Sequence, residues 1–218
     1  TIYSASDKIL CSSNGFLENI KNRGVPLEKL VFWPQFCDEP DLTKAVKPSI
    51  YFDNVFKIVF AGNIGEAQGL DLLLETAKNL KNRNYIKFYL VGDGRARERL
   101  ENAAKKEKLN NVIFTGKVSI EEADRYIHFA DCAYLSFKDN KIFNMTIPAK
   151  LQSYMACGTP ILAAVGGESA DIITAAECGI VCARNPLELS ETIEKMASSR
   201  DNTAEMRKKA YEFYRRNY

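Results

Sequence analysis

The sequence predicts an α/β protein built on a doubly wound, parallel, six-stranded sheet. Six short apolar runs alternate with longer segments whose apolar residues recur at helical spacing, and glycine closes several of the runs. Strands that alternate with helices at this spacing are joined by right-handed crossovers. Neighbouring strands are therefore expected to be parallel, with helices on both faces of the sheet.

The six apolar runs are the predicted strands. They cover residues 56–61, 86–91, 112–115, 132–135, 161–164 and 180–182. Each run is short and bounded by turn residues, as is typical of a buried strand.

The segments between these runs carry helix signals. The inner face of the first predicted helix consists of Leu70, Leu73, Leu74, Ala77 and Leu80. Ser119 followed by Glu122 forms a capping box, which marks a helix start. Other helices are predicted over 95–108, over 148–157, over 169–177 and from Pro186 onward.

The chain divides into four parts by pattern. Residues 1–33 predict a strand at 8–13, a helix at 15–22 and a strand at 29–33, a unit too small to fold alone. Residues 34–54 contain three prolines and mixed charge, which indicates a linker. Residues 55–205 form the main domain, and residues 206–218 begin a further helix. Because Thr1 opens the sequence in the middle of a pattern, we interpret the chain as an excised one.

Composition excludes several classes of function. Thirty basic residues against 28 acidic ones give a net charge of +2, so no global field favours nucleic acid. The six cysteines include no C-x-x-C pair, which favours small core residues in a reducing compartment over disulfides or a zinc site. No signal peptide or run long enough to span a membrane is present. The single histidine, His128, lies in a predicted helix and gives little support to a histidine-based triad.

The stretch 143–162 is where the chemistry is expected. Pro148 suits the first turn of a short helix, and Gly158 suits the position just after its end. Lys150 lies in that first turn, where unpaired N–H groups and the positive end of the helix dipole disfavour a cation. A bound anion would account for this lysine. A solvent-facing lysine at an exposed helix end would account for it equally well.

Four loops at the expected carboxyl edge of the sheet are rich in glycine or precede a helix. They are residues 62–69, 92–94, 116–119 and 165–169. Glycine allows backbone N–H groups to approach a ligand, and helix N-termini attract phosphate, so the loops together predict a phosphate-bearing ligand.

The loop glycines match no common nucleotide fingerprint. The first loop has the pattern G-x-x-G-x-x-x-G, which is neither the dinucleotide fingerprint nor the P-loop. Asp93 could be taken for the ribose-binding acid of a nicotinamide enzyme, but without that fingerprint it is better explained as a residue that organises its own turn. Its neighbours Gly92 and Gly94 also exclude an Asp-x-Asp metal motif.

Four motifs together resemble the donor-binding half of retaining glycosyltransferases of family 4, which have the two-domain GT-B fold with Rossmann-like halves. They are FAGNIGEAQG at 60–69, LVGDG at 90–94, FTGKV at 114–118, and PAK at 148–150 followed by MACGTP at 155–160. Residues 34–38, PQFCD, look like the hinge of this family. Residues 1–33 then resemble the end of an N-terminal, acceptor-side domain that is otherwise missing.

The resemblance implies transfer of a sugar from a nucleoside diphosphate donor, with retention and without a metal or cofactor. Lys150 would be catalytic, neutralising the leaving diphosphate. The other donor-binding residues implied are Gly62, Asn63, Gly65, Gln68, Asp93, Gly116, Lys117, Val118, Pro148, Ala149, Leu151 and Ser153. The loop at Gly62 and the Pro148 helix would hold the diphosphate, and residues 116–118 would border the base. The fragment alone is expected to be inactive.

The chain departs from the family pattern at several positions. Asn63 and Gln68 stand where many members carry Arg and Lys, and Met145 and Ser153 stand where many carry a pair of glutamates. Ser153 could still bind a ribose hydroxyl, although it supplies no carboxylate. The combination of PAK with SYMA at 153–156 is similar to a subgroup that acts in bacterial surface polysaccharide synthesis.

Two other functions remain open. Nucleotide-sugar 2-epimerases share the architecture, but the missing glutamates at 145 and 153 and the lone His128 count against them. A non-catalytic nucleotide-binding module would tolerate the lost charges.

The C-terminal segment mixes cations with aromatic residues. Arg207, Lys208, Lys209, Arg215 and Arg216 alternate with Tyr211, Phe213, Tyr214 and Tyr218. Such a segment could contact an anionic membrane that carries polyprenyl-linked acceptors, which would place a cytoplasmic protein at the inner face of the plasma membrane. We favour the alternative that the helix packs against protein, as the start of the return crossing to the acceptor domain.

Overall fold

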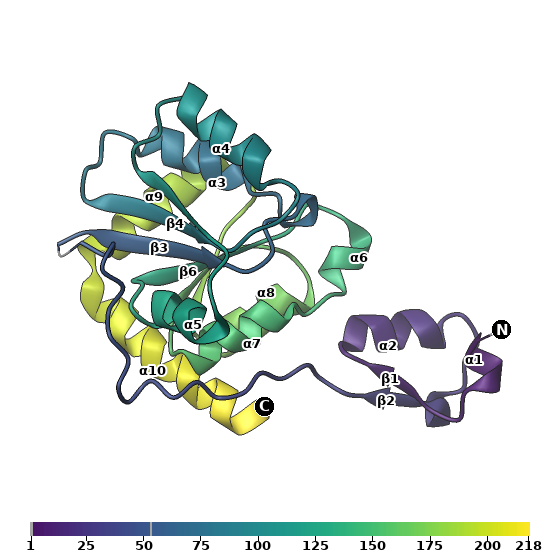
Figure 1. The fold of residues 1–218 in the computed structure, drawn as a ribbon. Coiled ribbons are helices and arrows are strands. Elements are labelled where there is room, and N and C mark those ends of the chain that lie inside the picture. Colours follow the sequence, from purple (N-terminus) through teal and green to yellow (C-terminus); the bar gives the residue numbers. More distant parts are fainter. Residues whose placement is uncertain (1, 53) are drawn as a thin grey trace.

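The computed structural model describes residues 2–52 and 54–218 and contains the predicted six-stranded sheet (Figure 1). The strand order is β5-β4-β3-β6-β7-β8, and every pairing is parallel. The strands are β3 (Phe56–Ala61), β4 (Ile86–Val91), β5 (Val112–Gly116), β6 (Cys132–Ser136), β7 (Ile161–Ala164) and β8 (Gly179–Val181). The order reverses between β3 and β6, where an open α/β sheet forms its ligand crevice.

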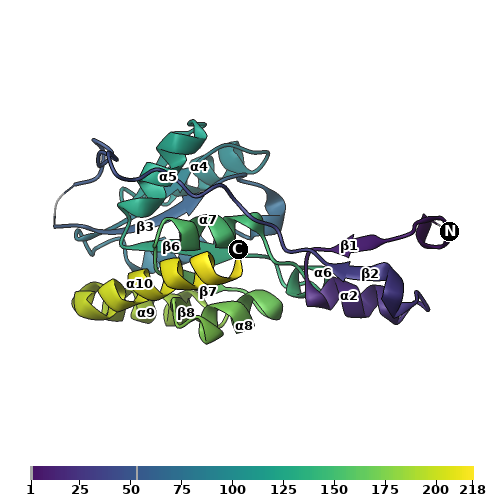
Figure 2. The ribbon, with the colours of Figure 1, turned by 90° about the horizontal axis from the view of Figure 1, so that it is seen from below.

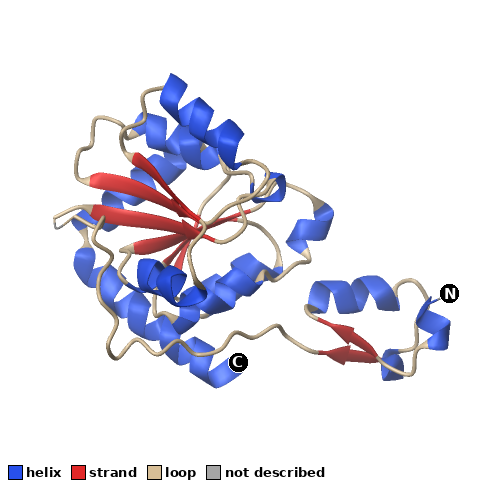
Figure 3. Cartoon of the chain, viewed as in Figure 1, coloured by secondary structure: helices blue, strands red, loops and turns tan. Residues whose placement is uncertain are grey.

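Helices cover both faces of the sheet, as the cartoon in Figure 3 makes clear. One face carries α3 (Asp71–Asn79), α4 (Arg97–Lys106) and α9 (Pro186–Ser198). The other face carries α5 (Ile120–His128), α7 (Ala149–Ala156), α8 (Glu168–Ala175) and α10 (Arg200–Asn217). The short helices η2 (Glu66–Gln68) and α6 (Lys141–Asn144) lie in connections. The fold is therefore doubly wound, as predicted.

The alternation of strand side chains explains the two cores. In β3, Phe56, Ile58 and Phe60 pack with one helix layer, while Val59 and Ala61 pack with the other. Successive side chains of a strand point to opposite faces, so the apolar residues of one strand contribute to both layers. All of β3 is buried, including Lys57, whose ammonium pairs with the Asp131 carboxylate at 2.9 Å.

Element boundaries differ slightly from the prediction, and three examples follow. Pro148 has an extended backbone and caps α7 instead of lying in its first turn. The strand predicted at 180–182 is Gly179–Val181. The C-terminal helix begins at Arg200 and not at 206, because residues 200–205 continue the helical pattern of the tail.

The N-terminal residues form a small unit beside the main sheet (Figures 1 and 2). It contains α1 (Ile2–Ala5), β1 (Ile9–Cys11), α2 (Asn14–Lys21), η1 (Leu27–Lys29) and β2 (Leu30–Phe32). Its two strands pair in parallel with each other and not with the main sheet. The strand, helix and strand predicted within residues 1–33 are thus present.

The segment between this unit and β3 is extended but packed. The Tyr51 ring contacts Tyr89 edge-on with a centroid separation of 4.5 Å, and its hydroxyl donates to the Tyr126 carbonyl at 2.8 Å. At the other end, the Tyr214 hydroxyl of α10 donates to the Cys37 carbonyl at 2.6 Å. The linker therefore follows the surface of α5 and α10.

The cysteines behave as predicted from their spacing. All six are free thiols, and all except Cys37 are buried. No helix within residues 2–52 and 54–218 has the length and apolarity needed to cross a membrane.

Candidate functional site

The loops after β3, β4 and β5 pack on one another at the carboxyl edge of the sheet. The Gly62 N–H donates to Val91, and the Gly92 N–H donates to Gly116, each at 2.9 Å. Gly92 has a φ of +129°, and a Cβ there would lie 2.1 Å from the Gly62 carbonyl oxygen. Only glycine permits this approach, which brings three of the four predicted loops together.

Lys150 reaches this edge from the first turn of α7. Its ammonium donates to the Gln68 side-chain oxygen at 2.7 Å and lies 3.9 Å from the centroid of the Phe60 ring. A Cβ on Gly62 would lie 3.7 Å from the same nitrogen. The structure therefore excludes the solvent-facing arrangement and places Lys150 with two predicted residues of the first loop.

The electrostatics around Lys150 favour an anionic ligand. Burial lowers the pKa of Lys150 to about 7, because the ammonium loses its hydration. Its hydrogen-bond partner is a neutral amide, and no carboxylate of the described residues forms an ion pair with it. Pro148 provides no side-chain cap for α7, so the positive end of the helix dipole adds to the lysine charge.

Two residues that support Lys150 were not predicted from the sequence. Phe60 supplies the face of an aromatic ring, a favourable contact for a cation. Ser136, buried at the end of β6, donates to the Gln68 backbone carbonyl at 2.6 Å and fixes the loop that carries the amide. In the sequence both positions look like ordinary strand residues. They are distinguished only because the ends of β3 and β6 meet at one edge of the sheet.

Asp93 organises the loop after β4. Its carboxylate accepts the Gly94 N–H at 2.7 Å and lies 3.6 Å from the Arg97 guanidinium. This matches the turn-organising interpretation. Asn63, on the neighbouring loop, lies against Gly65 and Gly94, where a Cβ on Gly65 would be 3.0 Å from the Asn63 amide nitrogen.

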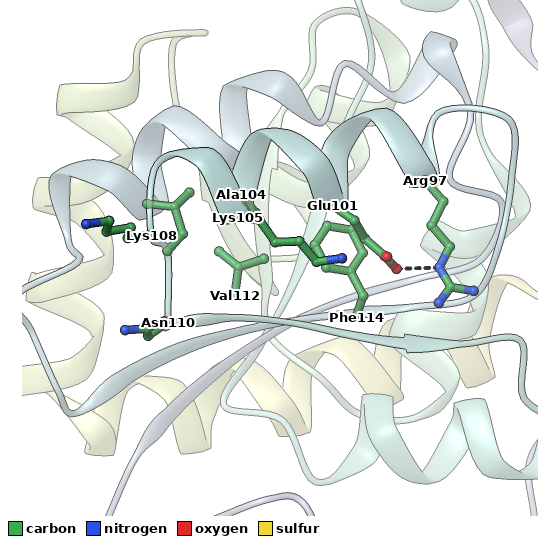
Figure 4. Close-up of a pocket in the computed structure, with 9 residues that line it drawn as sticks. Arg97, Glu101, Ala104, Lys105, Lys108, Asn110, Val112 and Phe114 are labelled. Atoms are coloured by element: carbon green, nitrogen blue, oxygen red, sulfur yellow. Dashed lines mark hydrogen bonds and ion pairs between the residues drawn. The ribbon is translucent and has the colours of Figure 1, made fainter.

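Gly116 lies at the end of β5 with a φ of +82° and an arginine beside it. A Cβ at Gly116 would be 3.3 Å from the Arg97 guanidinium, which also pairs with Glu101 at 2.7 Å. Figure 4 shows Arg97 at one end of an open hollow of about 770 Å³ along α4 and β5. Lys117 is exposed and Val118 half-buried directly after Gly116, so a ligand could reach all three residues.

The remaining predicted residues lie on or next to α7, and the side chain of one of them lies in the core. Ser153 lines a hollow of about 810 Å³ between α5, α7 and linker residues 37–45. Ala149 is exposed in the first turn. Leu151, however, is fully buried in the core with Tyr154 and Met155, and its N–H donates to Pro148 at 2.9 Å. The side chain of Leu151 is therefore closed off from solvent, and the donor contact of this residue stays a prediction.

The described part of the chain contains no alternative centre built on histidine or on metal ligands. The His128 Nδ1 lies 3.0 Å from the Cys157 carbonyl, and its ring packs edge-on against Phe129. His128 thus has a packing role in the structure. Among the described residues, no group of three His, Cys, Asp or Glu side chains is placed to bind a metal ion.

Sequence comparison identifies relatives with named functions. A family model described as "Glycosyl transferases group 1" matches residues 43–213. The chain is 27% identical over 160 residues to the putative colanic acid biosynthesis glycosyl transferase WcaI of Escherichia coli K12, covering 70% of this chain and 39% of the relative. It is 24% identical over 204 residues to the probable glycosyltransferase WbjE of Pseudomonas aeruginosa, covering 89% and 50%. The chain thus spans between about two fifths and half of these relatives.

Solved structures share the fold at low sequence identity, and they are GT-B glycosyltransferases. Anabaena Alr3699/HepE, solved with UDP and glucose, superimposes with a TM-score of 0.79 and 16% identity, covering 98% of this chain and 59% of that one. WaaG, a glycosyltransferase involved in lipopolysaccharide biosynthesis, gives 0.79 and 16%, covering 95% and 58%. With the family model matching most of the chain, the protein belongs to the group 1 glycosyl transferases.

Proposed function

We propose that this chain is the C-terminal, donor-binding part of a retaining glycosyltransferase of family 4. It would transfer a sugar to a glycan or lipid-linked acceptor in bacterial surface polysaccharide synthesis, and the donor we propose is a UDP-sugar. The names of the relatives support the pathway class, since they include colanic acid and lipopolysaccharide biosynthesis. UDP in the HepE structure supports the choice of nucleotide.

The observation that carries the proposal is the environment of Lys150. A half-buried ammonium with a neutral partner faces the Gly62 loop at the N-terminus of α7. When a glycosidic bond to a diphosphate breaks, negative charge grows on the leaving oxygen, and a pre-placed cation stabilises that charge more in the transition state than in the ground state. Backbone groups of the first loop and of Ala149 would hold the same diphosphate.

Other residues have proposed roles in holding the nucleotide. Gly116, Lys117 and Val118 would border the base, and Ser153 would bind a ribose hydroxyl. No metal is required, because Lys150 and the α7 dipole supply the positive charge. A polyprenyl-linked acceptor would bring this cytoplasmic enzyme to the inner face of the plasma membrane.

The test uses the whole enzyme with UDP-sugars and candidate acceptors. Release of UDP only in the presence of an acceptor, with an α-linked product from an α-linked donor, supports a retaining transferase. Interconversion of the sugar would indicate a 2-epimerase, and binding without turnover a non-catalytic module. Residues 1–218 alone are expected to bind UDP without transfer, since orienting the acceptor requires the other wall of the cleft.

A further inference from the structure

A glutamate of the sheet domain contacts the N-terminal unit. The Glu168 carboxylate, at the start of α8, accepts the Gly15 N–H at 2.9 Å. It also accepts the Asn14 N–H at 3.0 Å and the Asn14 side-chain amide at 2.7 Å. These donors form the first turn of α2, so the carboxylate lies at the positive end of that helix.

A second contact lies beside the first. Ser13 caps α2 by accepting the Phe16 N–H at 3.1 Å, and its hydroxyl donates to the Met145 carbonyl at 2.5 Å. Gly15 packs directly on Met145, where an added Cβ would lie 2.9 Å from the Met145 Cβ. The first turn of α2 therefore fits closely on the α6–α7 connection (Figure 2).

The surface that receives α2 is rigidly built. Gly167 has a φ of +63°, and a Cβ there would lie 2.0 Å from the Asn144 carbonyl oxygen. The Ser169 hydroxyl donates to the Thr146 carbonyl at 2.9 Å. The loop that presents Glu168 is thus locked to the connection that leads into α7, which also carries Lys150.

We propose that Glu168 is a positioning residue that closes the acceptor-side domain onto the donor site. This inference rests on the proposed transfer function. In the structure the Glu168 carboxylate accepts three N–H donors, and separation of the N-terminal unit from the sheet domain would return the carboxylate and these donors to water. Donor binding needs only the sheet domain, whereas transfer needs the closed cleft. Loss of the carboxylate should therefore reduce kcat and leave nucleotide affinity unchanged.

The contact can be measured directly by NMR on residues 1–218. In the wild type, the ¹⁵N relaxation of α2 amides should give the rotational correlation time of the sheet domain. In Glu168→Gln the α2 amides should tumble faster than the sheet, and the Asn14 and Gly15 amide protons should lose their carboxylate-dependent chemical shifts. Asp171→Asn removes a charge from the first turn of the same helix and is the matched control. Identical α2 correlation times in Glu168→Gln and the wild type would overturn the contact.

A second variant tests the interface from the other side. Gly15→Ala keeps Glu168 and replaces a helical glycine by a better helix former, but its methyl group would press on Met145. It should release α2 as Glu168→Gln does, while α2 itself remains helical by its chemical shifts.

The functional readout separates this inference from the function on which it rests. In the whole enzyme, Glu168→Gln should lower kcat by about tenfold or more, the loss expected for hydrogen bonds to a charged group. The Kd for UDP should stay within about twofold of the wild type. Released α2 with an unchanged kcat would overturn the positioning role. Absence of UDP binding and transfer in the wild type would instead contradict the proposed function, while the NMR experiment still decides the contact.

Discussion

Lys150 and Gln68 meet at 2.7 Å, the lysine ammonium donating to the oxygen of the glutamine amide. The partner has no charge, so it orients the ammonium without neutralising it. With Phe60 excluding water on one side, the cation remains available to an anion at the edge of the sheet. The first three predictions depend on this arrangement.

Lys150→Ala should weaken UDP binding by residues 1–218 about 10- to 100-fold, the range for losing a charge-assisted hydrogen bond. In the whole enzyme it should reduce kcat more than it raises the KM for donor, because leaving-group charge grows toward the transition state. Lys150→Arg should recover part of the affinity, since its planar guanidinium differs in shape. Isothermal titration calorimetry measures the affinity, with exposed Lys141→Ala as the control. Unchanged donor kinetics in Lys150→Ala would remove the lysine from the mechanism.

The affinity for UDP should fall as the pH rises above about 7. Burial lowers the pKa of free Lys150 to about 7, and a bound diphosphate raises it again, so binding at higher pH requires uptake of a proton. Between about pH 7.5 and 9 the terminal phosphate is already fully ionised, and the Kd should rise by at most about tenfold per pH unit. Lys150→Arg, always charged, should bind more weakly but without this slope. An equal slope in both proteins would assign the pH dependence to another group.

Stability of the ligand-free chain should show the reverse dependence. The folded pKa of Lys150 lies near 7 and the unfolded value near about 10.4, so the unfolded state binds more protons between these limits. The contribution of this lysine to the free energy of unfolding therefore increases with pH across that window, by at most about 1.4 kcal/mol per pH unit. Lys150→Met removes this term. Urea unfolding at pH 7 and 9 measures this. The free energy of unfolding of Lys150→Met, relative to that of the wild type, should be higher at pH 7 than at pH 9. Lys141→Met should show no such difference.

Most of the fold could be predicted from periodicity alone. The strands are mainly apolar because the sheet is covered on both faces, and Ser119 caps α5 as its capping box indicates. The packing of the linker could not be predicted, since Tyr51 is buried by Tyr89 and Tyr126, which lie far away in the sequence. The prolines of residues 34–54 indicate a linker but carry no information about its contacts.

The sequence predicts the candidate site only at positions where glycine or proline indicates a loop or a helix end. The loops at Gly62, Gly92 and Gly116 were found because their backbone geometry needs glycine. Leu151 was assigned by its neighbours in the motif, although its helical position turns it into the core. Phe60 and Glu168 have no local signal, because their contacts come from chain segments brought together by the crossovers and the linker.

The stacked loops should not tolerate a side chain at Gly92. Gly92→Ala combines a φ of +129°, a strained region for any L residue, with a Cβ 2.1 Å from the Gly62 oxygen. The strain alone costs about 1–3 kcal/mol, and the overlap adds to it. Gly158→Ala is the control, with a φ of +60° and its nearest neighbour at 3.5 Å, and should cost about 1–2 kcal/mol. In thermal unfolding, the melting temperature of Gly92→Ala should be well below that of Gly158→Ala. UDP binding should be lost only in Gly92→Ala. Equal melting temperatures would contradict the rigid stacking of these loops.

Several aromatic and basic side chains of α10 already contact protein. The Arg207 guanidinium donates to the carbonyls of His128 and Gly158 at 3.0 and 3.1 Å, and also to Ala130. Tyr211 and Arg215 both contact the Glu39 carboxylate of the linker. These side chains tie the helix to the domain and to the linker, which supports packing over membrane attachment.

Residues 1–218 should therefore not bind anionic vesicles through this helix. Attachment by surface charge would weaken as added salt shortens the Debye length from about 10 Å to 3 Å. Co-sedimentation with phosphatidylglycerol vesicles at low and high salt provides the measurement. Little binding is expected at either salt concentration, because engaging a membrane would break the Arg207 hydrogen bonds and expose the buried Tyr214 ring. Binding at low salt that disappears at high salt, and that is reduced in Lys208→Ala/Arg216→Ala, would contradict this assignment and make α10 a membrane-contacting helix.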